Sequence, residues 1–195
     1  NSLWSASRLT QPPASNAEKH PVYYQPAIAF DDNRHPWVFY GTGDRENPLD
    51  TTNPNEFFYA VKDDGLGVYP RRENQELQEI SSVNTFTPDP TKKGWYMQLE
   101  HSAQLVEKVL AKPVVFDNIL YFTTYAYKGN ATGCSIDGDA RLYMLYYQTG
   151  GGALYVDELT DLKGPPSSQR YKKIGSGVPS NPVISVNMRG VASIV

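Results

Sequence analysis

The stretch Gly94–Gly150 reads GWYMQLEHSAQLVEKVLAKPVVFDNILYFTTYAYKGNATGCSIDGDARLYMLYYQTG, and it decides the fold. Within it, the apolar runs Pro113–Phe116 and Ile119–Thr124 are separated only by Asp117 and Asn118. β-Branched and aromatic residues dominate both runs, and Asp-Asn suits a two-residue turn because both residues tolerate the left-handed region. This pattern predicts a β-hairpin.

A third apolar run, Arg141–Tyr147, follows after a polar loop and ends at the turn Gln148–Gly150. Strand, turn, strand, loop and strand in this order predict a meander of antiparallel strands.

The same order of runs occurs once upstream, and a third copy begins downstream. Upstream, the runs are Gln25–Phe30, Trp37–Gly43 and Glu56–Lys62, with turns at Asp31–Pro36 and Asp63–Gly65. Downstream, they are Asn181–Val186, a turn at Asn187–Gly190, and Val191–Val195. Each copy opens with a polar residue, a proline and an apolar run, which indicates internal repetition.

Repeated four-stranded meanders predict an all-β chain that forms part of a β-propeller. We expect residues 1–20 to be an N-terminal surface segment, 21–100 to be blade one, 105–160 blade two and 170–195 the start of blade three. About two and a half blades do not close a ring, and a propeller needs closure to protect its edges. We therefore expect a fragment, or one part of a larger propeller.

The segments between the repeats also carry expectations. We expect Trp95–Leu99 to be the outer strand of blade one and Ala153–Val156 the outer strand of blade two. We expect Leu105–Leu110 to be a link between the blades, and Tyr171–Ile174 to lead into the third repeat.

The segment Arg72–Ile80 is the one place where helical turns are expected. Its sequence, RENQELQEI, places Leu77 and Ile80 at a spacing that would bring both to one face of a helix.

Composition excludes several classes of partner. The 195 residues carry 18 basic and 21 acidic side chains, which gives no reason to expect nucleic acid or an anionic membrane. No apolar run is long enough to span a membrane, and the first residues lack a signal-peptide pattern. The single cysteine, Cys134, excludes an internal disulfide framework.

Two groups of acidic and amide residues are candidate metal ligands. Asp137 and Asp139 flank a glycine, and Asp44, Asn47 and Asp50 follow one another at a spacing of three. Calcium takes about 6–8 oxygens, so either group alone is too small, and a turn or a solvated loop is the favoured interpretation.

Catalytic motifs are missing from the sequence. His20, His35 and His101 lack a zinc spacing and are expected at the surface, and no serine lies in Gly-x-Ser-x-Gly. Gly41–Gly43 lacks the Lys-Ser/Thr of a phosphate loop, so it reads as a strand end. The sequence therefore predicts no catalytic residue and no cofactor.

An ordered set of blocks resembles the C-terminal propeller of the PilY family, exported proteins of bacterial type IV pili. The blocks are GWYMQL, EKVLAKPVVFDNILYFTTY, GC and ARLYMLYYQTG, together with VFYGTG and FFYAVKDDG upstream. The resemblance covers most of Tyr23–Val195.

The resemblance implies a type IV pilus accessory or tip protein that acts in pilus assembly, adhesion or surface sensing. Its expected place is the cell surface or pilus tip, reached through the periplasm or outer membrane, and its expected partners are minor pilins, host or surface ligands and the remainder of the propeller. The family propeller often carries a calcium loop of closely spaced Asp and Asn residues. This chain contains no Asp-x-Asp-x-Asp/Asn-Gly run, so calcium is left as an expectation for the full-length protein.

Two other functions stay open at this point. A quinone-cofactor-dependent dehydrogenase also uses quinoprotein-type blades whose strands end in Thr-Gly, but it needs a full ring, a calcium ion and a catalytic Asp. A carbohydrate- or protein-binding propeller unrelated to pili would use the loops Asp44–Asn55 and Lys128–Asp139 as its binding faces.

Overall fold

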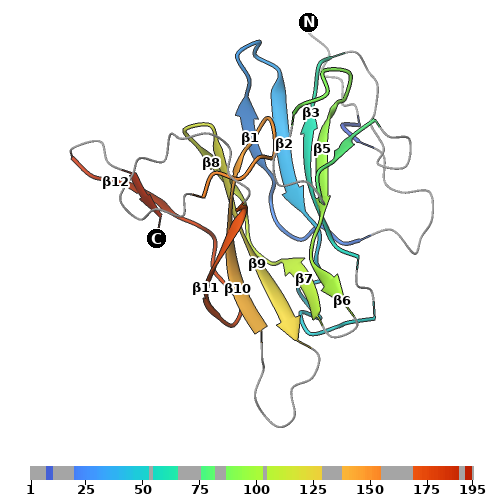
Figure 1. Cartoon of the computed structure of the whole chain (residues 1–195), viewed down its shortest axis with the longest axis vertical. Helices are drawn as coiled ribbons and strands as arrows, with labels where there is room; N and C mark the ends of the chain where they lie inside the picture. Colours follow the sequence, from blue (N-terminus) through green and yellow to red (C-terminus); the bar gives the residue numbers. More distant parts are fainter. Residues whose placement is uncertain are drawn as a thin grey trace, which may run out of the picture.

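The computed structural model describes residues 8–10, 20–52, 55–65, 76–81, 87–102, 105–128, 138–154, 169–188 and 192–194. These residues form β-strands, turns and loops, and no helix (Figure 1). The described part accordingly has no helix that could cross a bilayer. The predicted all-β class is confirmed.

The first sheet contains the upstream repeat. Its strands are β1 (Ala27–Phe30), β2 (Pro36–Gly41), β3 (Phe57–Lys62), β4 (Gln78–Glu79) and β5 (Gly94–Gln98). They lie in the order β1-β2-β3-β5-β4, and all neighbours are antiparallel except β4, which is parallel to β5. Strands β1, β2, β3 and β5 thus form a four-stranded antiparallel meander.

The second sheet contains the stretch that was predicted to decide the fold. Its strands are β6 (His101–Ser102), β7 (Leu105–Val109), β8 (Val114–Phe116), β9 (Ile119–Lys128), β10 (Gly138–Tyr146) and β11 (Tyr171–Ser176). Their order is β11-β10-β9-β7-β6, and β8 also pairs with β9. The turn between β8 and β9 has positive φ angles at Asp117 (47°) and Asn118 (64°), as the sequence predicts.

Strands β7 and β8 are two halves of one interrupted strand along β9. Val109 pairs with Thr124, and Val114 pairs with Tyr121. The step from Val109 to Val114 is therefore five residues where β9 advances by three, and the extra residues form a wide bulge. The second sheet is thus also a four-stranded meander, formed by β7/β8, β9, β10 and β11.

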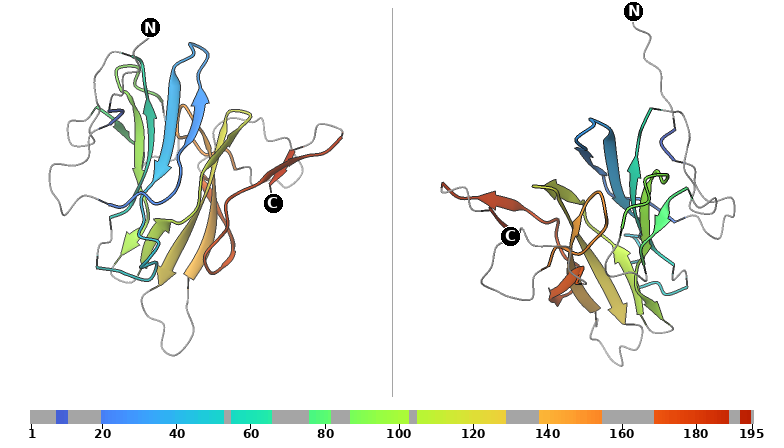
Figure 2. Two further views of the ribbon diagram at one scale, coloured as in Figure 1. Left: turned by 180° about the vertical axis from the view of Figure 1, so that it is seen from behind. Right: turned by 45° about the horizontal axis from the view of Figure 1, so that its top comes forward.

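A third hairpin completes the described chain. It consists of β12 (Ile184–Val186) and β13 (Ala192–Ile194), which pair antiparallel. Figure 2 shows this hairpin extending away from the two sheets. A proline lies just before the first strand of all three hairpins, at Pro26, Pro113 and Pro182, so the internal repetition is present in the structure.

The two sheets pack face to face through aromatic side chains. The rings of Phe58 on β3 and Phe122 on β9 are stacked with centroids 3.8 Å apart, and Tyr143 on β10, the neighbouring strand of the second sheet, stacks on Phe122 at 4.6 Å. Both phenylalanines are fully buried. The opposite face of the second sheet is covered in part by the third hairpin, where Ile184 and Ile194 pack against it. Each sheet therefore rests on the next one in chain order.

A turn of the second sheet is fixed to the first sheet by hydrogen bonds. The indole nitrogen of Trp95 donates to the carbonyl of Tyr147 at 2.8 Å, and the Tyr147 hydroxyl donates to the carbonyl of Phe30 at 3.0 Å. Both bonds join residues that are far apart in the sequence, so this turn fixes the relative position of the sheets.

Two expectations about connecting segments are wrong, and the expected outer strand Ala153–Val156 is described only in part. Leu105–Leu110 is largely strand β7 rather than a link. Tyr171–Ile174 belongs to β11, the fourth strand of the second sheet, rather than to the third repeat. Of Ala153–Val156, only Ala153 and Leu154 are described; they lie beside β10 next to a single bridge between Leu145 and Gly152.

The expected helical segment is also corrected. Its residues 72–75 lie outside the described residues, and Gln78–Glu79 is strand β4. Leu77 and Ile80 are both buried, but they belong to different apolar clusters rather than to one helical face. The predicted outer strand of blade one, Trp95–Leu99, is largely strand β5. It lies between β3 and the two-residue strand β4, so it is not the edge of the first sheet.

Candidate functional site

A buried carboxylate at the second sheet organises the most concentrated polar cluster of the described structure. Glu107 on β7 is fully buried. Its Oε1 accepts hydrogen bonds from the Thr124 hydroxyl at 2.5 Å and from the Tyr143 hydroxyl at 3.0 Å. Its Oε2 accepts from Arg141 at 2.9 Å and from the backbone N–H of Glu100 at 3.0 Å. Four donors thus converge on one side chain, as the burial of a carboxylate requires.

The strand pairing explains why these residues meet. In the register of the sheet, Arg141 on β10 lies opposite Thr124 on β9, and Val109, two residues beyond Glu107, also pairs with Thr124. Side chains at alternating positions share one face of a sheet, so Glu107, Thr124 and Arg141 come together on it.

The electrostatics of the cluster are set by burial and by one ion pair. Burial raises the pKa of the Glu107 carboxyl, while the Arg141 guanidinium and the Thr124 hydroxyl oppose that shift. Burial, and then the Glu107 charge, raise the pKa of the Tyr143 phenol well above its usual value. For Arg141, burial alone would lower the pKa, but the Glu107 charge raises it. Because four donors face Glu107, we interpret the pair as ionised.

Arg141 extends the cluster to the surface. Its Nη1 also lies 2.6 Å from Oε2 of Glu100, whose side chain is 53% exposed. On the other side, the Arg141 guanidinium lies 4.6 Å from the ring centre of Tyr171 on β11. The ion pair is therefore buried at Glu107 and open to solvent at Glu100.

A polar cleft adjoins this cluster between the two sheets; we call it the inter-sheet cleft. It has a volume of about 560 Å³, within the range of about 300–1,000 Å³ typical of ligand sites. Its walls include Ser81, Gln98, Glu100, Tyr143, Arg170 and Tyr171. Residues on or close to strands β4 and β5 of the first sheet thus face residues on or close to strands β10 and β11 of the second sheet.

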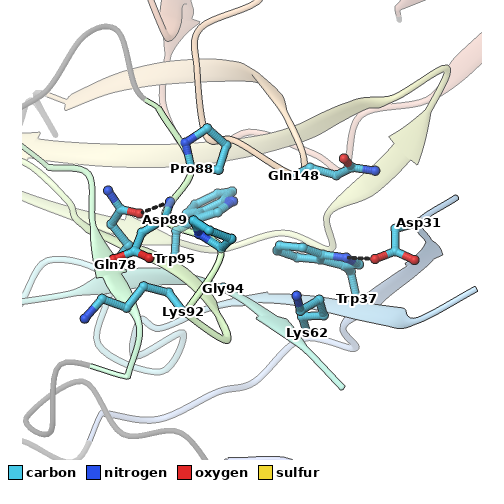
Figure 3. Close-up of a pocket in the computed structure, with 11 residues that line it drawn as sticks. Asp31, Trp37, Lys62, Gln78, Pro88, Asp89, Lys92, Gly94, Trp95 and Gln148 are labelled. Atoms are coloured by element: carbon cyan, nitrogen blue, oxygen red, sulfur yellow. Dashed lines mark hydrogen bonds between the residues drawn. The ribbon is translucent and has the colours of Figure 1, made fainter. Parts of the chain in front are cut away.

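A second, smaller pocket lies against the first sheet, with a volume of about 170 Å³ (Figure 3). It is lined by Trp37, Trp95 and Gln148, and Figure 3 shows the indole of Trp37 bonded to Asp31. The two tryptophans are only 7% and 1% exposed, so their rings serve the core rather than a ligand.

Of the candidate metal ligands Asp44, Asn47 and Asp50, the structure brings Asn47 into contact with a buried lysine. Lys108 is 1% exposed, and its Nζ donates to the Asn47 carbonyl at 2.7 Å. Burial lowers the pKa of Lys108, while the charges of Glu56, Asp50 and Asp44 raise it. An ammonium group of the chain itself therefore lies beside this loop, at the carbonyl of Asn47.

The carboxylates of this loop also serve its backbone. Asp44 accepts from the N–H groups of Glu46 and Asn47, and Asp50 accepts from the N–H and the hydroxyl of Thr52. These are side-chain turns of the kind that Asp favours. The sequence pattern favours a solvated loop here, and these bonds of Asp44 and Asp50 lie within the loop itself.

The second candidate pair is described only in part. Asp137 and the single cysteine, Cys134, lie outside the described residues. Asp139 on β10 pairs with Lys128 at 3.3 Å and with Lys173 at 2.6 Å. Within the described ranges, no group of three or more His, Cys, Asp and Glu side chains is placed to hold a metal ion.

One histidine differs from expectation. His20 was expected at the surface, but its side chain is 3% exposed and lies 3.2 Å from the buried carboxylate of Glu56. His101 is exposed and His35 is partly exposed, where it contacts Asp31.

The sequence contained one signal for the buried cluster. Glu107 and Lys108 are two adjacent charges inside the otherwise apolar run LVEKVL. Charged residues are almost never fully buried unless they are paired, so such an interruption indicates either a loop or a buried ion pair. The sequence pattern predicts that Leu105–Leu110 is a link between blades. The structure instead shows a strand in which Glu107 forms a buried ion pair with Arg141.

In comparisons with known proteins, no protein-family model, no curated protein and no solved structure matches the chain.

Proposed function

We propose that the chain is a non-catalytic segment of a β-propeller in a type IV pilus accessory or tip protein, which acts in pilus assembly, adhesion or surface sensing. Its place is the cell surface, and its partners are minor pilins, surface or host ligands and the rest of the propeller.

The observation that supports a propeller is that successive sheets pack on one another in chain order. The first sheet packs on the second through Phe58 and Phe122, and the second packs on the third hairpin through Tyr121, Ile184 and Ile194. Blades of a propeller are four-stranded meanders that pack on their neighbours in this order.

The segments that precede Pro26, Pro113 and Pro182, the prolines before the three hairpins, support the same arrangement. One open pocket, of about 360 Å³, is lined by Tyr24, Leu110 and the residues from Val178 to Asn181. The second and third of these segments are joined by a 2.6 Å hydrogen bond from the Lys112 N–H to the Asn181 side chain. Equivalent segments that meet at one place are expected around the axis of a propeller.

The role of the polar groups supports a scaffold. The indole of Trp95 and the hydroxyl of Tyr147 join the sheets, and Glu107 is saturated by four donors. These groups hold the fold together. The link to pili rests on the ordered sequence blocks from GWYMQL to ARLYMLYYQTG.

The test is to recover surface filaments by shearing the bacterium that encodes the chain and to identify their proteins by peptide mass spectrometry. Peptides of this chain are expected in the filament fraction together with minor pilins, and they should be lost from it when pilus assembly is disabled. An abundant outer-membrane protein serves as the contamination control. Equal recovery of the chain with and without pili would overturn the proposal.

A further inference from the structure

The inter-sheet cleft offers a set of polar groups that the internal hydrogen bonds leave unused. Glu100 bonds Arg141 through Oε2, and its Oε1 has no partner among the described residues. The Gln98 side-chain N–H bonds Asn55, which leaves its carbonyl oxygen, and the Ser81 hydroxyl oxygen accepts from the Gln98 backbone, which leaves its O–H. The cleft therefore presents both acceptors and a donor.

An aromatic ring stands at the edge of the same cleft. Tyr171 on β11 is 41% exposed. The guanidinium of Arg141 lies over this ring, and the ring of Tyr143 lies 5.1 Å away at an angle of 38°. Tyr171 is thus held from within by the buried cluster while its remaining surface is open to a ligand.

The charges of the cleft cancel. The charged residues of the cleft wall are Glu100 and Arg170, and Glu100 is paired with Arg141 behind the wall. Arg141 is committed to two carboxylates, and Arg170 is 7% exposed and bonds the Ile80 carbonyl, so both are poor sites for a phosphate or carboxylate ligand. The polar walls equally disfavour an apolar ligand.

We propose that the inter-sheet cleft binds a neutral polyhydroxylated ligand, a sugar ring, between Tyr171 on one side and Gln98 and Glu100 on the other. Sugar hydroxyls both donate and accept hydrogen bonds, which matches the mixed groups of the wall. The C–H face of a sugar ring is apolar and suits contact with an aromatic ring. The volume of about 560 Å³ accommodates such a ring together with bridging water.

The cleft would bind this ligand whether or not the chain belongs to a pilus, so the two proposals fail separately. A chain that is absent from filaments but binds sugars overturns only the pilus assignment. A chain found in filaments that binds no sugar overturns only the cleft.

The test is ligand-observed NMR on the whole chain with glucose, galactose and N-acetylglucosamine as neutral probes, and with N-acetylneuraminic acid and inorganic phosphate as anionic probes. At least one neutral sugar is expected to bind with a Kd of about 1 mM, as usual for few polar contacts. The anions should bind less tightly. Preference for either anion, or no response to any neutral sugar at millimolar concentration, overturns the proposal.

Two variants locate the site. Glu100→Gln keeps the side-chain shape but removes a charged acceptor, and Tyr171→Ala removes the ring; each is expected to weaken binding about tenfold, roughly the effect of one lost charge-assisted bond or aromatic contact. Glu46→Gln and Phe30→Ala are matched controls, since Glu46 is exposed in another loop and Phe30 is 65% exposed on β1.

Circular dichroism and the thermal midpoint establish that each variant is folded. If Tyr171→Ala is unfolded, Glu100→Gln decides alone, because the Glu100 side chain is 53% exposed and Arg141 keeps its ion pair with Glu107. Sugar binding that survives in the folded Glu100→Gln variant at full affinity places the sugar elsewhere and overturns the proposal.

Discussion

The indole N–H of Trp95 in the first sheet donates a 2.8 Å hydrogen bond to the carbonyl of Tyr147 in the turn that follows β10 of the second sheet. Trp95 is 1% exposed, so neither group can exchange this partner for water. The bond joins two sheets whose other contacts are mostly between apolar side chains. It therefore gives the packing a defined position as well as stability.

We expect Trp95→Phe to destabilise the chain because it leaves the buried Tyr147 carbonyl without its donor. The expected loss is about 1–3 kcal/mol in the free energy of unfolding, measured by urea titration. Trp37→Phe is the matched control: its indole bonds Asp31 at a longer 3.3 Å, and that bond is local to one hairpin. Equal losses in the free energy of unfolding for the two variants would show that the bond between the sheets stabilises the chain no more than the local bond does.

Gly150 and Gly65 form a second matched pair. They follow β10 and β3 and have nearly the same positive φ, 68° and 71°. A Cβ atom at Gly150 would lie 2.2 Å from Cδ1 of the fully buried Ile80, whereas a Cβ at Gly65 would meet nothing within 4 Å.

Both Gly→Ala changes carry the cost of a left-handed residue, but only Gly150→Ala also overpacks the core. We expect Gly150→Ala to lower the free energy of unfolding by about 1–3 kcal/mol more than Gly65→Ala does. Thermal and urea unfolding of both variants measure the difference. Similar values for the two would mean that Ile80 moves aside without cost.

We expect Glu107→Gln to be among the most damaging single substitutions. It replaces Oε2, which accepts from Arg141 and from the Glu100 N–H, with an amide NH2 that cannot accept, and a buried donor left without a partner costs about 1–3 kcal/mol. Asp139→Asn is the control, because its partners Lys173 and Lys128 are 58% and 40% exposed and such pairs contribute about 0–1 kcal/mol. A loss below about 1 kcal/mol for Glu107→Gln would contradict the importance of the ion pair.

Lys108 tests the metal interpretation of the loop that contains Asp44, Asn47 and Asp50. If its ammonium is the cation of this loop, EDTA and calcium leave the thermal midpoint of the wild-type chain unchanged. Lys108→Gln should lower the midpoint and make the loop more sensitive to proteolysis, while Lys112→Gln should not. A midpoint that falls on addition of EDTA to the wild-type chain would instead indicate a bound metal ion.

Acid is expected to destabilise the chain through its turn carboxylates. Hydrogen bonds from Thr52, Thr91 and Lys173 lower the pKa values of Asp50, Asp89 and Asp139 respectively. A carboxyl whose pKa is lower in the folded state stabilises the fold at pH values above its unfolded pKa, about 4. This contribution is lost as the pH falls through the lower folded value.

The measurement is the urea midpoint as a function of pH below about 5. The midpoint should fall with decreasing pH, and Asp50→Asn should flatten the curve. Glu107 contributes with the opposite sign, since burial raises its pKa and protonation is then favoured in the folded state. A midpoint that rises as the pH falls would show that Glu107 outweighs the turn carboxylates.

The hairpins were predictable because their signals are local. Asp117 and Asn118 adopt left-handed conformations between two apolar runs, and the proline before each hairpin marks its start. The aromatic side chains of Phe58 and Phe122 fill the space between the packed sheets.

The failures concern long-range pairing. Strand β7 was missed because Glu107 and Lys108 interrupt its apolar pattern, and their partners Arg141 and Asn47 lie far away in the sequence. Strand β11 is exposed throughout and lacks an alternating apolar pattern, so only its pairing with β10 identifies it. The inter-sheet cleft likewise depends on how two sheets meet, which local patterns do not encode.

The junction between the sheets also gives the molecule a direction. Trp95, the donor, comes from the earlier sheet, and Tyr147, the acceptor, comes from the later one. A contact built from two different surfaces is heterologous, and such contacts lead to head-to-tail order rather than to back-to-back pairs. Sheets added in this way follow one another in a single rotational sense, and the angle between successive sheets alone determines whether the series ends in a closed ring or continues as an open spiral.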